Sequence, residues 1–160
     1  MSPATLRRFH SLCLSGCLVL AALPARGEKH IAPRGGTLLE LGDEFAQIEF
    51  ILDLQQGNLT AYILDGEAEN PVRIRQSSID IVVDQASYAG SRSATFTLHL
   101  KAVADVLTAE TVGDTSEFMV HAGSLYGVSS LKGKIKRITI KSRSFQNLPF
   151  SIPAGEATQH

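Results

Sequence analysis

Apolar and polar residues alternate with a period of two through most of the chain from Thr37 onward, which is the pattern of half-buried β-strands. The clearest case is residues 46–54, where every even-numbered position is apolar. The turn residues 55–58 follow, and then a second alternating run at 59–64. Two such runs around a Gly-Asn turn predict a β-hairpin.

Further strands are predicted at short intervals along the chain. Period-two runs or short apolar segments indicate strands at 72–74, 79–83, 95–101, 117–121, 136–141 and 148–152. The inward side chains of the later strands should include Phe96, Leu98, Leu100, Phe118, Val120, Ile138, Ile140, Leu148, Phe150 and Ile152. Residues 124–132 are rich in Gly and Ser and have room for one helical turn, and residues 142–147 should connect the last hairpin. About eight short antiparallel strands predict an all-β fold, either a single small β-sandwich or an open barrel.

The first 27 residues have the order of a secretory signal sequence. Arg7 and Arg8 precede an uncharged, largely apolar run at 12–23, and small or turn-forming residues at 24–27 end it. The run is shorter than the ~20 apolar residues that a membrane-spanning helix needs. We therefore expect residues 1–27 to be removed as a signal peptide, leaving a periplasmic or secreted protein with no transmembrane anchor after cleavage.

A second processing route starts from Leu14–Cys17, which has the form of a bacterial lipobox. In that route Cys17 would become the lipid-anchored first residue. Because the apolar run continues past Cys17, cleavage near Ala25 or Gly27 fits better, and we favour the soluble product over the lipoprotein. That cleavage removes both cysteines, so the mature domain must be stable without a disulfide.

The remaining chain is expected to divide into a flexible leader at 28–35, a β-domain at 36–153 and a polar tail at 154–160. Its length suits one domain. Three of the 15 basic residues and none of the 16 acidic residues lie in 1–27, which leaves 12 basic against 16 acidic residues and a net charge of −4. This balance gives no general electrostatic attraction for nucleic acid, so we expect none as a partner.

Charge is distributed unevenly within the domain. Residues 40–69 contain eight acidic and no basic residues, whereas residues 132–143 contain six basic and no acidic ones. One interpretation is that these residues are solvated strand faces, with lysines that discourage edge-to-edge aggregation. The other is a dipolar surface that docks an acidic partner or a polyanion.

Histidines give only a weak indication of a metal site. Four of them follow residue 27, namely His30, His99, His121 and His160, and none lies closer than 22 residues to another. A tetrahedral zinc site needs three or four ligands, usually including a close sequence pair. His30 is the weak metal candidate, because it precedes the Pro33–Gly36 turn, but Arg34 places a fixed positive charge nearby. We expect no tight divalent site.

Other chemistry is also weakly indicated. The predicted hairpin could bring Asp53, Asp65, Glu67 and Glu69 together, yet the D-x-D-x-D-G order of a calcium loop is missing, so a solvated loop is the favoured interpretation. No serine stands in a G-x-S-x-G motif. We therefore predict a non-enzymatic domain without a cofactor.

Several segments resemble small uncharacterised exported bacterial proteins, and are similar to a module found with periplasmic adaptor subunits of heavy-metal efflux pumps. They are Pro33–Thr37, Leu41–Gly42, Glu49–Phe50, Leu59–Gly66 and the apolar residues Phe118, Leu131, Ile135, Ile138, Ile140, Phe145 and Phe150. The resemblance covers most of residues 32–153 and its motifs are structural. It implies a role near metal efflux or metal homeostasis. The family pattern has a His before the paired glycines, where this chain has Arg34.

The resulting functional hypothesis is an exported binding module with a protein partner in the cell envelope. Two alternatives belong to other classes. One is a structural component of the envelope, and the other is a hydrolase or lyase whose site forms only in three dimensions. A cleft with a pKa-shifted histidine or carboxylate would favour the enzyme. An exposed apolar or charged patch would favour the binding module.

Overall fold

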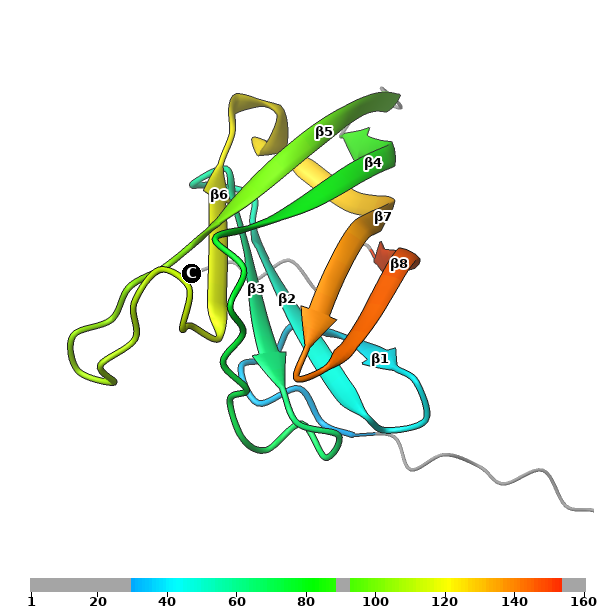
Figure 1. Ribbon diagram of the computed structural model, residues 1–160. Helices are drawn as coiled ribbons and strands as arrows, with labels where there is room; N and C mark the ends of the chain where they lie inside the picture. The colour runs from blue at the N-terminus through cyan, green and yellow to red at the C-terminus, as the bar shows by residue number, and fades with distance from the viewer. Residues whose placement is uncertain (1–29, 89–92, 154–160) are drawn as a thin grey trace, which may run out of the picture.

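A computed structural model describes residues 30–88 and 93–153 of the chain. In these residues eight strands and one short 3₁₀ helix follow one another (Figure 1). The strands are β1 (Thr37–Leu41), β2 (Ala46–Asp53), β3 (Asn58–Leu64), β4 (Ser78–Tyr88), β5 (Ser93–Ala102), β6 (Glu117–His121), β7 (Val128–Ile140) and β8 (Arg143–Ile152), and the 3₁₀ helix is η1 (Gly123–Leu125). The predicted signal peptide, Cys17 and the predicted tail at 154–160 lie outside the described residues.

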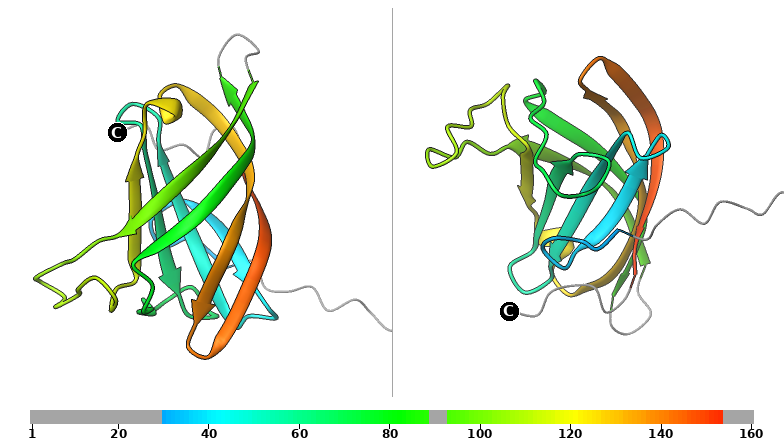
Figure 2. Two further views of the ribbon diagram at one scale, coloured as in Figure 1. Left: turned by 45° about the horizontal axis from the view of Figure 1, so that its top comes forward. Right: turned by 90° about the horizontal axis from the view of Figure 1, so that it is seen from below.

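All eight strands belong to one antiparallel sheet in the order β1-β2-β3-β6-β5-β4-β7-β8. Figure 2 shows that the sheet coils around a central axis into a nearly closed barrel. In a barrel the inner face of every strand lines the same interior, so the inward-facing side chain of every second residue contributes to one core. The all-β prediction is confirmed, and of its two architectures the structure is the barrel.

The interior is filled by aliphatic side chains and two stacked phenylalanines. Phe50 of β2 and Phe150 of β8 come from strands far apart in the sheet order, and their ring centroids lie 4.8 Å apart. Most surrounding side chains are almost fully buried, among them Ile48, Leu52, Leu59, Ile63, Ile81, Val83, Leu100, Phe118, Leu131, Ile135, Ile138 and Ile140. The inward positions expected from the alternation therefore lie in or against the core.

Two strand irregularities let the long strands bend around this core. In β4 the register shifts between Val83 and Ala86, both of which are buried. In β7 the inward alternation shifts by one between Ile135 and Ile138, opposite Asn147 of β8, which has a φ of 52°. The register of β7 against β8 does not change at this point, so only the β4 feature is a bulge. Bulges increase the local twist and are common where a sheet curves into a barrel.

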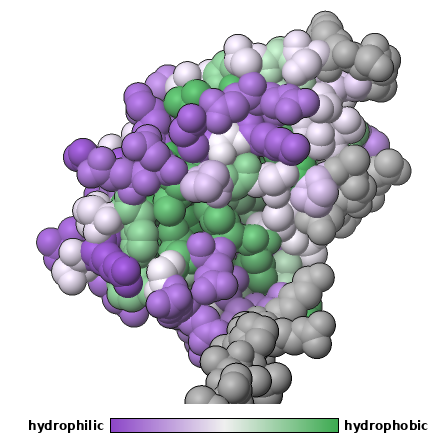
Figure 3. Space-filling view, turned by 90° about the vertical axis from the view of Figure 1, so that its right-hand side faces the viewer, coloured by the Kyte–Doolittle hydropathy of each residue, from purple (hydrophilic) through white to green (hydrophobic). Residues whose placement is uncertain are grey.

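The barrel closes between the two edge strands through side chains. Phe45, just before β2, and Phe145 of β8 have ring centroids 5.8 Å apart, and the Arg143 guanidinium lies 5.3 Å and 5.1 Å from the two rings. Leu39 of β1 and Leu148 of β8 are half-buried and pack on the core. Figure 3 shows the side of the molecule where these edge strands lie, with a continuous hydrophobic area bordered by hydrophilic residues.

Three predicted boundaries are wrong. Residues 72–74 form no strand, because Pro71 lacks a donor and only single bridges, Leu64–Pro71 and Ile74–Thr115, tie this segment to the sheet. The last hairpin is longer than expected on both arms: β7 starts at Val128 instead of 136, and β8 includes most of the predicted connection at 142–147. Gly and Ser residues in 128–134 weaken the strand signal, although these positions pair with both β4 and β8.

Gly133 shows why the Gly/Ser-rich part of β7 belongs to the sheet. It is paired with Phe150, and a Cβ added at Gly133 would lie 2.5 Å from the Val82 carbonyl oxygen and 3.1 Å from Phe150 Cε1. The absent side chain therefore makes the space that the Phe150 ring occupies.

We predict that Gly133→Ala lowers the free energy of unfolding by about 1–3 kcal/mol, because the backbone and the Phe150 ring must both move. Urea denaturation of the full chain measures this change. Gly123→Ala is the matched control: an added Cβ there meets no atom within 4 Å, and its effect should stay within about 0.5 kcal/mol. Equal stability of the two variants would contradict the packing role given to Gly133.

Candidate functional site

The histidines that the structure describes lie apart from one another. His99 Nδ1 lies 2.7 Å from Asp80 Oδ1, and His121 Nδ1 lies 3.0 Å from Asn58 Oδ1. His30 Nε2 is buried without a hydrogen-bond partner, 3.9 Å from Glu44 Oε1. His160 lies outside the described residues. Within residues 30–88 and 93–153, no three His, Cys, Asp or Glu side chains are grouped so that they could hold a metal ion.

The acidic residues of the predicted hairpin do not converge either. Asp53 stands at the β2–β3 turn, while Asp65 follows the opposite end of β3, so the proposed grouping of Asp53 with the loop carboxylates is wrong. Asp53 Oδ1 accepts hydrogen bonds from the main-chain nitrogens of residues 55 and 56. Asp65 accepts from the Glu69 and Asn70 nitrogens, and its bond from the Asn70 amide lowers the pKa of the Asp65 carboxyl. Both carboxylates cap turns.

A buried carboxylate on the outer face of β2 holds the segment before β1. Glu49 is fully buried and accepts hydrogen bonds from the main-chain nitrogens of Arg34 and Gly36, at 2.7 Å and 3.0 Å. The Arg34 guanidinium pairs with Glu49 at 3.3 Å and lies 4.0 Å from the centre of the Tyr62 ring. The described part of the segment predicted as a flexible leader, residues 30–35, is thus tied to the barrel through Arg34.

The same network ends at Glu117. Tyr62 donates its hydroxyl to Glu117 Oε1 at 3.4 Å, and burial raises the pKa of both groups. Because the Glu49 oxygens are already bonded to Arg34 and Gly36, this arrangement secures the N-terminal turn and leaves no opening for a substrate at that carboxylate.

Most of the basic residues at 132–143 are spread over the outer surface. Lys134 pairs with Asp84 at 3.4 Å, and Lys136 lies 3.8 Å from Asp80. Arg143 packs on the rings at the closure of the barrel. Two residues of the run thus form ion pairs and Arg143 packs on aromatic rings, while Lys132 and Arg137 are exposed on β7. Lys141 lines a groove described below.

The most unusual surface feature is the connection between β5 and β6. Residues 103–116, here called the projecting loop, extend away from the barrel at the lower left of Figure 1 and in both views of Figure 2. Two tight turns build the loop. Asp105 and Glu110 exchange main-chain hydrogen bonds of 3.1 Å and 2.8 Å, and Thr111 and Asp114 do the same at 3.1 Å and 2.9 Å.

A buried carboxylate organises the base of the projecting loop. Glu110 Oε1 accepts hydrogen bonds from the Ser116 nitrogen at 3.1 Å and from the Ser116 hydroxyl at 2.7 Å. The Thr115 hydroxyl, fully buried, donates to the Val103 carbonyl at 2.7 Å and so joins the two ends of the loop. Glu110 itself is only 8% exposed, which means that its charge needs compensation.

Arg73 supplies that compensation from outside the loop. Its Nε lies 3.5 Å from Glu110 Oε1, its Nη1 donates to Asp114 Oδ2 at 3.2 Å, and its Nη2 donates to the Thr108 carbonyl. One side chain therefore contacts the tip, the middle and the base of the loop. The neighbouring residue Ile74 is buried and paired with Thr115 through the main chain, which fixes the position from which Arg73 reaches out.

The braced loop presents hydrophobic side chains to solvent. Val106 and Leu107 are 95% and 94% exposed, and Val112 is 63% exposed. Leu107 is held by its main-chain nitrogen, which donates to Asp105 Oδ1 at 2.8 Å. A chain with enough freedom would fold such residues back onto its own apolar surface. Here the hydrogen bonds of the loop keep them outward.

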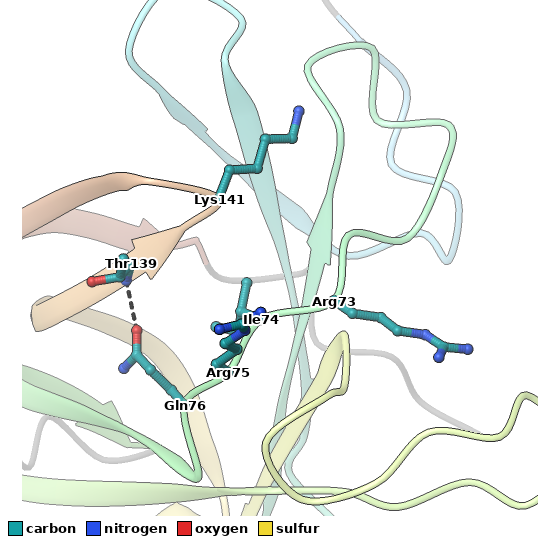
Figure 4. Close-up of a pocket in the computed structure, with 6 residues that line it drawn as sticks. All are labelled: Arg73, Ile74, Arg75, Gln76, Thr139 and Lys141. Carbon is teal, nitrogen blue, oxygen red and sulfur yellow. Dashed lines mark hydrogen bonds between the residues drawn. The ribbon is translucent and has the colours of Figure 1, made fainter.

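On the other side of Arg73 lies a groove of about 450 Å³, lined by Arg73, Ile74, Arg75, Gln76, Thr139 and Lys141. Figure 4 shows Gln76 bonded to Thr139 across the groove, while the Arg73 side chain runs away from them. Segment 73–76 thus borders both surface features, since it braces the loop on one side and forms a groove wall on the other.

Sequence reasoning assigned no role to the projecting loop, because it has neither strand periodicity nor a catalytic motif. A usable signal was present in the apolar pair Val106–Leu107, which follows Asp105 in a segment without other strand features. What the sequence could not supply is the contact with Arg73, which lies 41 residues before Asp114.

Comparison of the chain with protein-family models, with curated proteins and with solved structures finds no match in any of the three. Among the described residues there is no helix of the length and apolar character required to cross a membrane.

We predict that Glu110→Ala loosens the projecting loop and lowers the free energy of unfolding by about 1–3 kcal/mol, because the buried Ser116 nitrogen loses its hydrogen-bond acceptor and Arg73 loses one of its two carboxylate partners. Limited proteolysis should cut within 103–116 faster than in the parent chain. Thr111→Ala, an exposed change in the same loop, is the control and should leave the cleavage rate unchanged. Unaltered cleavage in Glu110→Ala would show that the carboxylate does not hold the loop.

Proposed function

We propose that this chain is an exported, non-enzymatic binding module, periplasmic or secreted, that docks a protein partner in the cell envelope through the projecting loop. The observation that carries the proposal is the pair Val106 and Leu107, almost fully exposed at the tip of a loop whose base is braced by buried polar contacts. Contiguous exposed apolar surface, unlike isolated apolar residues, marks interaction sites, and these two residues are adjacent in the loop.

Covering the apolar tip of the loop would contribute substantially to binding. Burying a Val or Leu side chain contributes about 1.5–3 kcal/mol, so covering both residues of the tip would contribute about 3–6 kcal/mol to binding. A loop already ordered before binding avoids part of the entropy cost that a flexible one has to overcome. The contacts of Arg73 and Glu110 supply that order in the free protein.

The charge of the loop favours a protein over a lipid surface. Asp105 and Asp114 flank the apolar tip, and the nearby cation Arg73 is already bonded to Glu110 and Asp114. Segments that insert into membrane interfaces usually combine apolar residues with Lys and Arg, which anionic lipids attract. A protein pocket with an apolar floor and a basic rim complements this loop better.

The resemblance to exported proteins associated with efflux adaptors fits a docking role, since it carries structural motifs only. We propose accordingly that the partner protein takes part in metal efflux or metal homeostasis. His30 contributes no ligand set to it in the described residues, because Glu44 is the only carboxylate within 4 Å of that ring.

We predict that a photoreactive amino acid placed at Leu107 in the full chain, expressed in its own host, yields one discrete protein adduct. The same amino acid at Gln146, an exposed residue of β8, is the control and should not yield it. Adding Val106→Asp to the Leu107 probe should reduce the adduct at least about tenfold, as expected when half of the apolar contact is lost. Identical adducts from both positions, or adducts with lipid alone, would contradict the proposal.

A further inference from the structure

The groove beside the projecting loop is lined by cationic side chains, two of which form no ion pair with a described residue. Three of its six lining residues are cationic, namely Arg73, Arg75 and Lys141. Arg73 is bonded to carboxylates of the projecting loop, and its side chain points away from the groove (Figure 4). Among the described residues, no ion pair involves Arg75 or Lys141.

The surroundings of Lys141 leave its charge available. Its Nζ lies 5.5 Å from the centre of the Phe45 ring, and the residue is exposed. The Asn70 bond and, to a smaller extent, the Lys141 charge lower the pKa of the Asp65 carboxyl, but Lys141 and Asp65 form no ion pair within 4 Å. An incoming anion would therefore not have to displace an existing ion pair of Lys141.

The groove walls are fixed by main-chain and amide contacts. The Thr139 nitrogen donates to Gln76 Oε1 at 2.6 Å, and Gln76 Nε2 donates to the Ser78 carbonyl at 3.2 Å. Arg75 follows the buried Ile74, whose main chain is paired with Thr115. The backbone that carries the Arg75 guanidinium is thus held on both sides, while the guanidinium itself is exposed.

We propose that this groove binds a phosphate group carried on a larger molecule, with Arg75 as the principal ligand and Lys141 as the second charge. The planar guanidinium presents paired N–H donors that match two oxygens of a phosphate, and a lysine ammonium adds a compact charge. A volume of about 450 Å³ exceeds that of a free phosphate and lies within the range of small-molecule sites. The phosphate belongs either to a soluble ester or to a lipid headgroup.

The test uses the full chain and two probes, inorganic phosphate and vesicles containing phosphatidylglycerol. Amide chemical shifts around residues 73–76 and 139–141 should change saturably with phosphate, and Arg75→Gln should weaken that binding at least about fivefold. Lys141→Gln should weaken it by a smaller factor. Lys132→Gln removes the same charge from an exposed position of β7 outside the groove and should leave the binding unchanged.

The vesicle arm distinguishes the two sources of the phosphate. Flotation with vesicles that depends on Arg75 and is competed by inorganic phosphate identifies a lipid headgroup, whereas phosphate binding without flotation identifies a soluble ester. The proposal is overturned if neither probe binds in an Arg75-dependent manner, or if Lys132→Gln weakens binding as much as Arg75→Gln. Leu107→Ser should leave phosphate binding intact, so loss of partner docking and loss of the anion site give different results.

Discussion

Everything else in this structure depends on the coiling of one antiparallel sheet around its own apolar face. Residues 30–153 contain no cysteine, so the fold has to gain its stability from packing. An eight-stranded sheet that stayed open would leave its apolar face half-covered, and coiling brings Phe50 of β2 against Phe150 of β8 across the interior. The bulge in β4, the shifted alternation in β7 and the missing side chain of Gly133 are the local adjustments that accompany this curvature.

The coiling of the sheet also determines which parts of the molecule are available to bind other molecules. The interior is filled by core side chains, so the features free to interact lie on the outer surface and on the connections between strands. The long connection between β5 and β6 is one of them, and it is ordered by Glu110 and Arg73 instead of by the core. Arg73 belongs to the irregular segment after Pro71, which forms single bridges in place of a strand and is thereby free to serve both the loop and the groove.

The period of the sequence was informative wherever one face of a strand is buried. Ile48, Phe50 and Leu52 alternate with residues on the outer face, and the predicted hairpin of β2 and β3 is confirmed. The strand prediction was wrong where contacts between distant residues interrupt the period-two pattern. At Gly133 the ring of Phe150 occupies the space where a side chain would lie. At Lys136 the alternation of buried and exposed residues in β7 shifts by one.

The candidate sites were harder to predict from the sequence than the strands. His30 and the carboxylates around Asp65 attract notice by residue type, yet the structure gives the Asp65 carboxylate a turn-capping role and His30 a single acidic neighbour. The projecting loop and the groove depend on pairs such as Arg73 with Asp114 and Gln76 with Thr139, which are 41 and 63 residues apart. Periodicity and short motifs contain no information about such contacts.

The proposed docking role requires a rigid loop that holds the side chains of Val106 and Leu107 outward before any partner binds. Backbone ¹⁵N relaxation of the free full chain tests it most directly, through the order parameters of Val106 and Leu107. A rigid loop should give order parameters of about 0.8 or higher, close to those of the strands. Values below about 0.6 would show a flexible loop and would contradict it.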